Sequence, residues 1–92
     1  MSALLSDKIP TINAMFRLQW EEAQACFVLL YPEGMVQLNG PAGEILSLVD
    51  GQNSVAQIIA LLQKKFPEAD DLAEDVLAFL REAQQNQWLS LV

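Results

Sequence analysis

Hydrophobic and polar residues alternate near the start of the chain and then give way to longer apolar runs. Between residues 16 and 21 every second side chain is apolar, which predicts a half-buried strand. The apolar run at 26–31 is rich in β-forming residues and predicts a central strand that is covered on both faces, or one whose second face meets a partner. Pro32 and Gly34 suit a tight turn, after which residues 35–38 predict a short third strand, antiparallel to the second.

Beyond this strand the apolar spacing becomes helical. Three stripes with a period of three to four residues predict three helices, over about residues 41–49, 55–66 and 72–83. Ser54 and Gln57 have the spacing of a capping box at the start of the second helix. Asp71 and Glu74 have the same spacing at the start of the third, so the second and third helices each have a predicted start.

The order of these elements predicts the fold class. Three strands followed by three helices indicate an α+β protein, in which a three-stranded antiparallel meander packs on the helices. These are also the parts of a winged helix-turn-helix, with the strands placed first. We expect residues 1–14 to form a flexible or extended arm and residues 15–92 to form a single domain. The apolar tail from Trp88 either caps the core or contacts a second copy or another partner.

Charge and cysteine content restrict the partners and the compartment. The chain carries 5 cationic and 12 acidic residues, for a net charge of −7. Nucleic-acid binding draws its affinity from lysine and arginine, so this balance argues against a nucleic-acid partner and against anionic membrane surfaces. No apolar stretch approaches the ~20 residues of a membrane span. Cys26 is the only cysteine, so no intrachain disulfide can form, and we expect a cytoplasmic protein.

The residue types needed for catalysis are largely missing. The chain has no histidine, which removes the commonest general base and the commonest metal ligand. Cys26 lies in an apolar strand, and the acidic residues near position 72 are those expected in the first turn of a helix. No glycine pattern of a phosphate-binding loop is present. We therefore expect no enzyme activity, no metal site and no cofactor.

An edge strand provides a candidate binding surface. In a meander the third strand lies at the edge of the sheet, and residues 35–38 carry neither a charge nor a proline to protect it. A peptide could add a strand there, so a proline at Val36 should impair binding by removing a backbone donor. The third helix could wall such a groove with Val76, Phe79 and Leu80, although their spacing favours ordinary core residues.

Several motifs in a fixed order resemble one known family. The segments that carry the resemblance are Leu29-Leu30-Tyr31-Pro32-Glu33-Gly34, Val36-Gln37-Leu38-Asn39, Asp50-Gly51, Phe66-Pro67, Asp75-Val76 to Phe79-Leu80, and Trp88-Leu89. Together they are similar to the signature of PqqD proteins of pyrroloquinoline quinone (PQQ) biosynthesis, over about residues 16–91.

The resemblance implies a function. PqqD proteins are peptide chaperones, or recognition elements for ribosomally made modified peptides, with three strands and three helices of the winged-helix type. They bind the precursor peptide PqqA and present it to PqqE, a radical S-adenosylmethionine enzyme that crosslinks a glutamate and a tyrosine of the peptide. In this family the peptide adds a strand beside the third strand, against the third helix. The positions implied here are Met35, Val36, Gln37, Leu38, Asp75, Val76, Phe79 and Leu80.

Two other functions remain open at this point. The fold parts would suit a winged-helix DNA-binding regulator, although the charge does not. The apolar composition and the tail would suit a structural dimerisation domain, and a homodimer is compatible with peptide binding as well.

Overall fold

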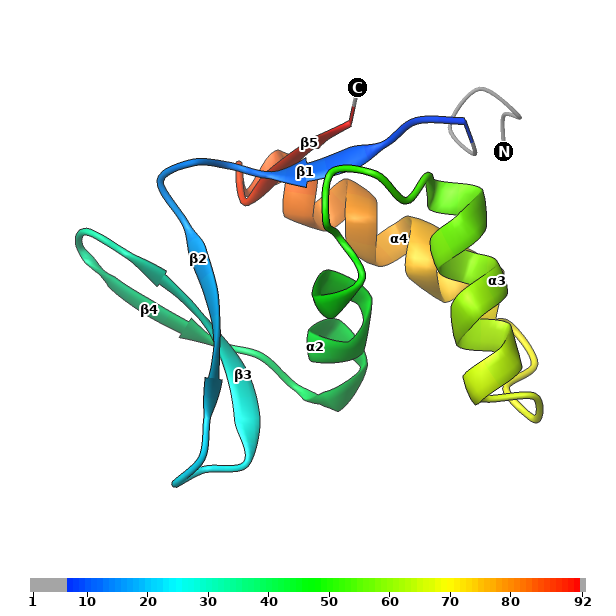
Figure 1. The fold of residues 1–92 in the computed structure, drawn as a ribbon, viewed down its shortest axis with the longest axis horizontal. Coiled ribbons are helices and arrows are strands. Elements are labelled where there is room, and N and C mark those ends of the chain that lie inside the picture. The colour runs from blue at the N-terminus through cyan, green and yellow to red at the C-terminus, as the bar shows by residue number, and fades with distance from the viewer. Residues whose placement is uncertain (1–6, 92) are drawn as a thin grey trace.

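The computed structural model describes residues 7–91 and confirms the α+β class, with three helices and antiparallel sheets (Figure 1). The elements follow in the order β1 (Pro10–Ile12), β2 (Arg17–Glu21), β3 (Cys26–Tyr31), β4 (Gly34–Gln37), α2 (Gly40–Ser47), α3 (Val55–Lys65), α4 (Leu72–Gln85) and β5 (Leu89–Leu91). Within the described residues, no helix has the length and apolarity required to cross a membrane.

Strands β2, β3 and β4 form the predicted antiparallel meander, with β3 in the middle. Leu29 of β3 faces the core and has no exposed surface. Its neighbour Val28 points to the other face and is equally buried. The middle of the strand is therefore buried on both faces, whereas Cys26 and Leu30, on the face of Val28, keep some exposed surface.

Two further strands, β1 and β5, were not predicted. They pair antiparallel, so that Pro10 lies opposite Leu91 and Thr11 opposite Ser90. The amide of Val55 also donates to the carbonyl of Lys8, with an N···O distance of 2.8 Å. Residues 10–12 of the predicted arm are thus a strand held by the last residues of the chain, and residues 1–6 of that arm lie outside the described residues.

Local hydrogen bonds explain where the helices begin. The side chain of Asn39 accepts from the amide of Ala42 at 2.8 Å and caps α2. Ser54 and Gln57 form the predicted capping box of α3. The predicted box at α4 is wrong, because Asp71 has a backbone φ of −103° and ψ of 35° and makes no side-chain cap.

Helix α4 ends in a Schellman motif. The amide of Trp88 donates to the carbonyl of Ala83 at 2.9 Å, and that of Gln87 donates to Gln84 at 3.0 Å. This geometry requires a left-handed residue after the helix, and Gln87 supplies it with a φ of 65°. Asn86, one residue earlier, has a φ of −80° and is not left-handed.

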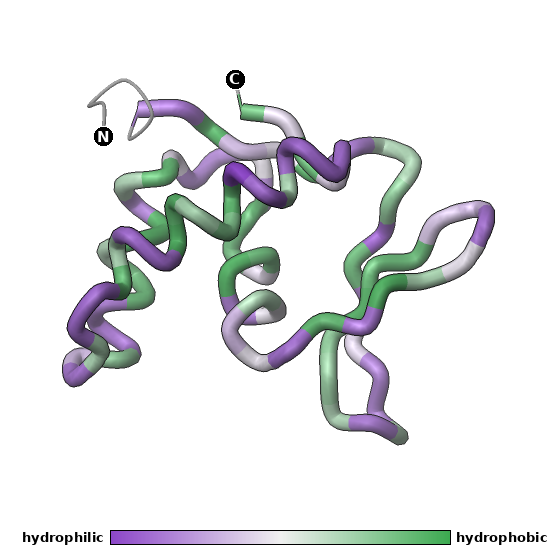
Figure 2. The backbone as a smooth tube through the Cα atoms, turned by 180° about the vertical axis from the view of Figure 1, so that it is seen from behind, coloured by the Kyte–Doolittle hydropathy of each residue, from purple (hydrophilic) through white to green (hydrophobic). Residues whose placement is uncertain are grey.

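The helices and the sheet share one core. Hydrophobic and hydrophilic residues alternate along α3 and α4 in Figure 2, as expected for helices with one buried face. Their fully or almost fully buried side chains meet those of the sheet and of β5; the cluster includes Leu29, Leu38, Ile45, Leu46, Val55, Ile58, Leu62, Val76, Leu80 and Leu89. Leu89 joins it from the tail, which places this residue of the tail in the core.

Helix α2 provides the close contact between the sheet and the helices. A Cβ added at Gly43 would lie 2.9 Å from Cδ2 and 3.2 Å from Cβ of Phe27 on β3. Only glycine allows this approach, because real Cβ atoms do not come so near to other heavy atoms. The position of the sheet on the helices therefore depends on Gly43.

Candidate functional site

Strand β4 has a free edge. It pairs with β3 on one side, and no other strand among residues 7–91 pairs with its second side. Its sequence, Gly34–Gln37, contains neither a charged residue nor a proline. It therefore presents unpaired backbone groups without the usual protection of an edge strand.

The register identifies which backbone groups point outward. Opposed residues in an antiparallel pair alternate between hydrogen-bonded and non-hydrogen-bonded pairs. The amide of Leu38 donates to the carbonyl of Phe27 at 3.0 Å, which fixes the phase of this alternation. Val36 then takes part in the next hydrogen-bonded pair, whereas Met35 and Gln37 belong to non-hydrogen-bonded pairs. The N–H and C=O groups of Met35 and Gln37 consequently face the free edge.

This phase corrects one prediction. From the sequence, Val36 was expected to supply a donor at the edge, but its N–H points into the sheet, toward β3. The hydrophobic pattern could not determine this, because it fixes the facing of side chains and not the hydrogen-bonding side of each residue.

The side chains of the predicted strand residues divide between two faces. Val36 is half-buried against the core and Leu38 is 5% exposed. Met35 and Gln37 project from the opposite face, and Met35 is 49% exposed. Gln37 Nε2 donates to Cys26 Sγ at 3.6 Å on that face. A strand added at this edge would thus meet apolar core side chains on one face and a half-exposed methionine on the other.

The predicted residues of α4 occupy different environments. Asp75 is exposed, whereas Val76 and Leu80 have no exposed surface. Phe79 is half-buried, and its ring centroid lies 6.4 Å from that of Trp88. The stripe on α4 is therefore mostly core, which is the alternative that its helical spacing favoured.

Helix α4 does not lie along β4. Figure 1 shows α2 between the two elements, with the meander projecting to one side of the helices. The stripe of α4 instead packs with α3, β5 and the rest of the core. The structure thus brings the four strand residues together and the four helix residues together, but it does not join the two sets in one groove.

An apolar pocket lies between the three helices, and the sequence did not predict it. Its volume is about 530 Å³, within the range of ligand pockets. Leu62 and Val76, both almost fully buried, form its floor together with Ile45. The other lining residues are Gly40, Pro41, Glu44, Phe66, Ala69, Leu72 and Asp75. These residues come from three helices and a loop, so only the packing of the helices places them around one hollow.

The rim of this pocket, which we call the helical pocket, is held by polar contacts. Lys65 Nζ lies 2.7 Å from Glu44 Oε1, in an ion pair that links α3 to α2. The same ammonium group is 5.7 Å from the ring centroid of Phe66, which is 40% exposed. These contacts restrain the Phe66 ring at the mouth of the pocket. Because Lys65 and Glu44 are both partly exposed, the contacts stabilise this position of the ring only modestly.

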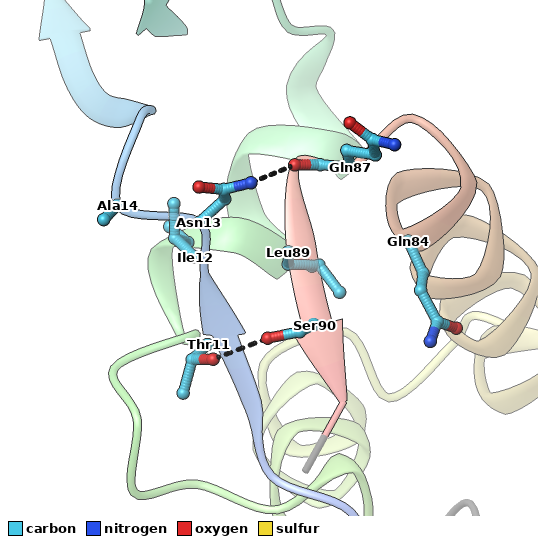
Figure 3. Close-up of a pocket in the computed structure, with 8 residues that line it drawn as sticks. All are labelled: Thr11, Ile12, Asn13, Ala14, Gln84, Gln87, Leu89 and Ser90. Atoms are coloured by element: carbon cyan, nitrogen blue, oxygen red, sulfur yellow. Dashed lines mark hydrogen bonds between the residues drawn. The ribbon is translucent and has the colours of Figure 1, made fainter.

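A second, more polar hollow lies beside the β1–β5 pair (Figure 3). Thr11 Oγ1 and Ser90 Oγ are 3.1 Å apart, and Asn13 Nδ2 donates to the carbonyl of Gln87 at 3.0 Å. The side chain of Gln84 reaches its wall from α4. These hydrogen bonds join the two ends of the chain to each other, and we assign this hollow a structural role.

Known proteins are similar to this chain in sequence. Residues 26–89 match the family model "Coenzyme PQQ synthesis protein D (PqqD)". A protein named "PqqA binding protein" from Azotobacter vinelandii is 52% identical over 99% of both chains. A protein of the same name from Pseudomonas aeruginosa strain PAO1 is 53% identical over 99% of both chains.

Two solved structures share the fold. One is the solution structure of the PqqD truncation of Methylobacterium extorquens PqqCD, described as a functional and stand-alone recognition element for ribosomally synthesised and post-translationally modified peptides. It is 34% identical, with a TM-score of 0.75, over 94% of this chain and 92% of that one. The crystal structure of PqqD from Xanthomonas campestris is 33% identical, with a TM-score of 0.56, over 99% of both chains.

Proposed function

This chain belongs to the PqqD family, and we propose that it binds a PqqA precursor peptide during PQQ biosynthesis without catalysing a reaction itself. Relatives that are about half identical over 99% of the chain carry the name PqqA binding protein, which supports the choice of peptide. The observation that carries the mode of binding is the free, unprotected edge of β4.

In this proposal the peptide adds a fourth strand to the meander. The backbone groups of Met35 and Gln37 pair with the peptide, while Val36 and Leu38 hold β4 against β3 and the core. Main-chain pairing of this kind provides affinity for an extended peptide. Specificity then comes from the side chains that the peptide places on each face of the sheet.

The helix residues implied by the family resemblance have two roles in this proposal. Asp75 and Phe79, which retain exposed surface, contact the peptide beyond the strand. Val76 and Leu80 support them from the core. Because α4 lies apart from β4 in the described structure, the peptide must extend past the strand or the sheet must move toward α4 to make both contacts.

We further propose that the protein acts in the cytoplasm as an adaptor that presents the bound peptide to the radical S-adenosylmethionine enzyme PqqE. In this proposal the domain responsible comprises residues 15–92, in a variant of the winged helix-turn-helix, and the described part of the preceding arm, residues 7–14, contributes β1. The net charge of −7 does not favour the alternative, a DNA-binding regulator. The other alternative, a dimerisation domain, rests on the apolar composition and the tail from Trp88, and it can coexist with peptide binding.

A titration of isotope-labelled protein with a synthetic PqqA peptide tests this proposal. We expect saturable amide shifts centred on Met35 and Gln37, with a dissociation constant of about 10 μM or tighter, and no shifts with a peptide of scrambled sequence. The absence of shifts at millimolar PqqA, with and without PqqE, would contradict it. Sedimentation of the free protein over a range of concentrations distinguishes the dimerisation alternative.

A further inference from the structure

The helical pocket has no role in strand addition, yet its lining is mainly apolar. Ile45, Leu62 and Val76 on its floor belong to the core, whereas Phe66 at the mouth is 40% exposed. A half-exposed phenylalanine above an open apolar floor leaves hydrophobic surface in contact with water. Binding of an apolar group at such a site is favourable, because it removes this hydrophobic surface from water.

The pocket begins where β4 ends. Gly40, at its mouth, follows Gln37 by three residues, so the two Cα atoms are at most about 11 Å apart. In Figure 1 β4 points toward the first turn of α2. Gly40 and Pro41 in this turn line the pocket. A strand paired with β4 would reach the helical pocket after about three more extended residues.

The mouth also carries acidic groups. Asp75 and Glu44 place two carboxylates among the lining residues, and Lys65 pairs with one of them, Glu44. A peptide segment with a lysine or arginine beside its apolar side chain would meet complementary charge there.

From this continuity and charge we infer that the helical pocket binds one large apolar side chain of the precursor peptide, next to a basic residue, and fixes the register of the peptide on β4. This inference rests on the proposed function and deepens it. Strand addition alone specifies register weakly, because backbone hydrogen bonds are the same for every two-residue shift of the peptide. A side-chain anchor beyond the end of β4 removes this ambiguity.

Methyl labelling of Ile45 and Leu62 tests the inference in the unmodified protein. We expect their methyl signals to shift on saturation with PqqA peptide, together with the amides of Met35 and Gln37. In peptides with one apolar residue replaced by alanine, a single replacement should abolish the methyl shifts and keep the amide shifts. Amide shifts without methyl shifts would overturn the pocket inference and leave strand addition intact, and the loss of both would overturn both.

A variant that fills the mouth provides a second test. Ala69 is exposed and lines the pocket, so Ala69→Trp should occupy it and weaken PqqA binding by about tenfold. The matched control is Ala60→Trp, an exposed position on α3 outside both hollows, where we expect no change. Equal affinities of the two variants for PqqA would contradict the inference that the helical pocket anchors a peptide side chain.

The acidic mouth is tested separately. Asp75→Asn should weaken PqqA binding several-fold at low ionic strength and should have little effect at high salt, because salt screens exposed charges. An unchanged affinity at low salt would contradict the part of the inference that places a basic residue of the peptide at the mouth of the pocket.

Discussion

Gly43 shows how one residue determines the relation between two elements. Its missing side chain lets α2 approach Phe27 of β3, and the added Cβ would meet two atoms of that ring side chain at 3.2 Å or less. Alanine forms helices better than glycine, so helix propensity alone would favour a substitution here. The close contact reverses this expectation, because α2 or β3 must move to make room.

We expect Gly43→Ala to lower the free energy of unfolding by about 1–3 kcal/mol, the usual cost of overpacking a core. Gly40→Ala is the matched control in the same helix. No atom lies within 4 Å of a Cβ at that position, so it should be neutral or slightly stabilising. Urea denaturation of both variants measures the difference, and a Gly43→Ala protein as stable as the control would show that the contact is not restrictive.

Gln87 occupies a conformation that side chains disfavour. Its φ of 65° is required by the Schellman motif that ends α4, and glycine adopts this region without strain. We expect Gln87→Gly to raise the free energy of unfolding by about 0.5–1 kcal/mol. Gln85→Gly, at the last residue of α4, should lower it instead, by up to about 1 kcal/mol. Thermal unfolding that ranks the two variants in the opposite order would contradict this assignment.

At the scale of single residues, the sequence predicted helix caps better than it predicted tertiary contacts. The Ser54 capping box follows from the spacing of two residues and a local geometry, and it is present. The equivalent box at Asp71 has the same spacing but is absent, because the backbone there is not in the extended conformation that an N-cap requires. The role of Gly43 depends on a residue 16 positions away, Phe27, which no local pattern reveals.

At the scale of elements, the free edge of β4 has a defined hydrogen-bonding phase. Gln37→Pro removes an N–H that faces the edge, whereas Val36→Pro removes one that faces β3. We expect Gln37→Pro to keep the fold and to weaken PqqA binding at least tenfold. Val36→Pro should disrupt the sheet itself and destabilise the protein by about 3 kcal/mol or more.

Circular dichroism and peptide titration of the two proline variants separate these effects. Gln37→Ala controls for loss of the side chain, including its contact with Cys26, and should bind the peptide nearly as well as the parent. If Gln37→Pro is folded and binds as tightly as Gln37→Ala, strand addition at β4 is wrong.

The long elements were predictable and the short ones were not. The meander and all three helices follow from apolar runs and periodic stripes that each span several residues. Strands β1 and β5 have three residues each, too few for a period to emerge, and among the described strands each pairs only with the other. The eight candidate site residues were chosen from the predicted elements and a family resemblance. The separation of α4 from β4 depends on the packing of α2, which the pattern along the chain does not contain.

For the whole molecule, the end of the chain completes the core. Leu89 on β5 is 3% exposed and lies in the same cluster as residues of α3, α4 and β3. The sequence left open whether this tail covers the core or contacts a partner. In the structure Leu89 covers the core, while Trp88 remains half-buried beside Phe79.

We therefore expect Leu89→Ala to destabilise the protein by about 2–5 kcal/mol, as for other buried leucines. Ser90→Ala removes a hydroxyl contact with Thr11 at the surface and should cost about 1 kcal/mol or less. Denaturant unfolding of the two variants provides the comparison. Equal stabilities would mean that β5 does not contribute to the core and that the tail is free to serve a partner.

The pairing of β1 with β5 has a consequence for engineering and for gene fusion. Because Pro10 lies opposite Leu91, the first and last described strands, β1 and β5, are neighbours on the same side of the molecule, away from β4 (Figure 1). A short linker could close the chain into a ring and allow circular permutation, with new ends opened in the turn between β2 and β3. For the same reason the domain could be inserted into a loop of a host enzyme, with the free edge of β4 on the side away from the junction.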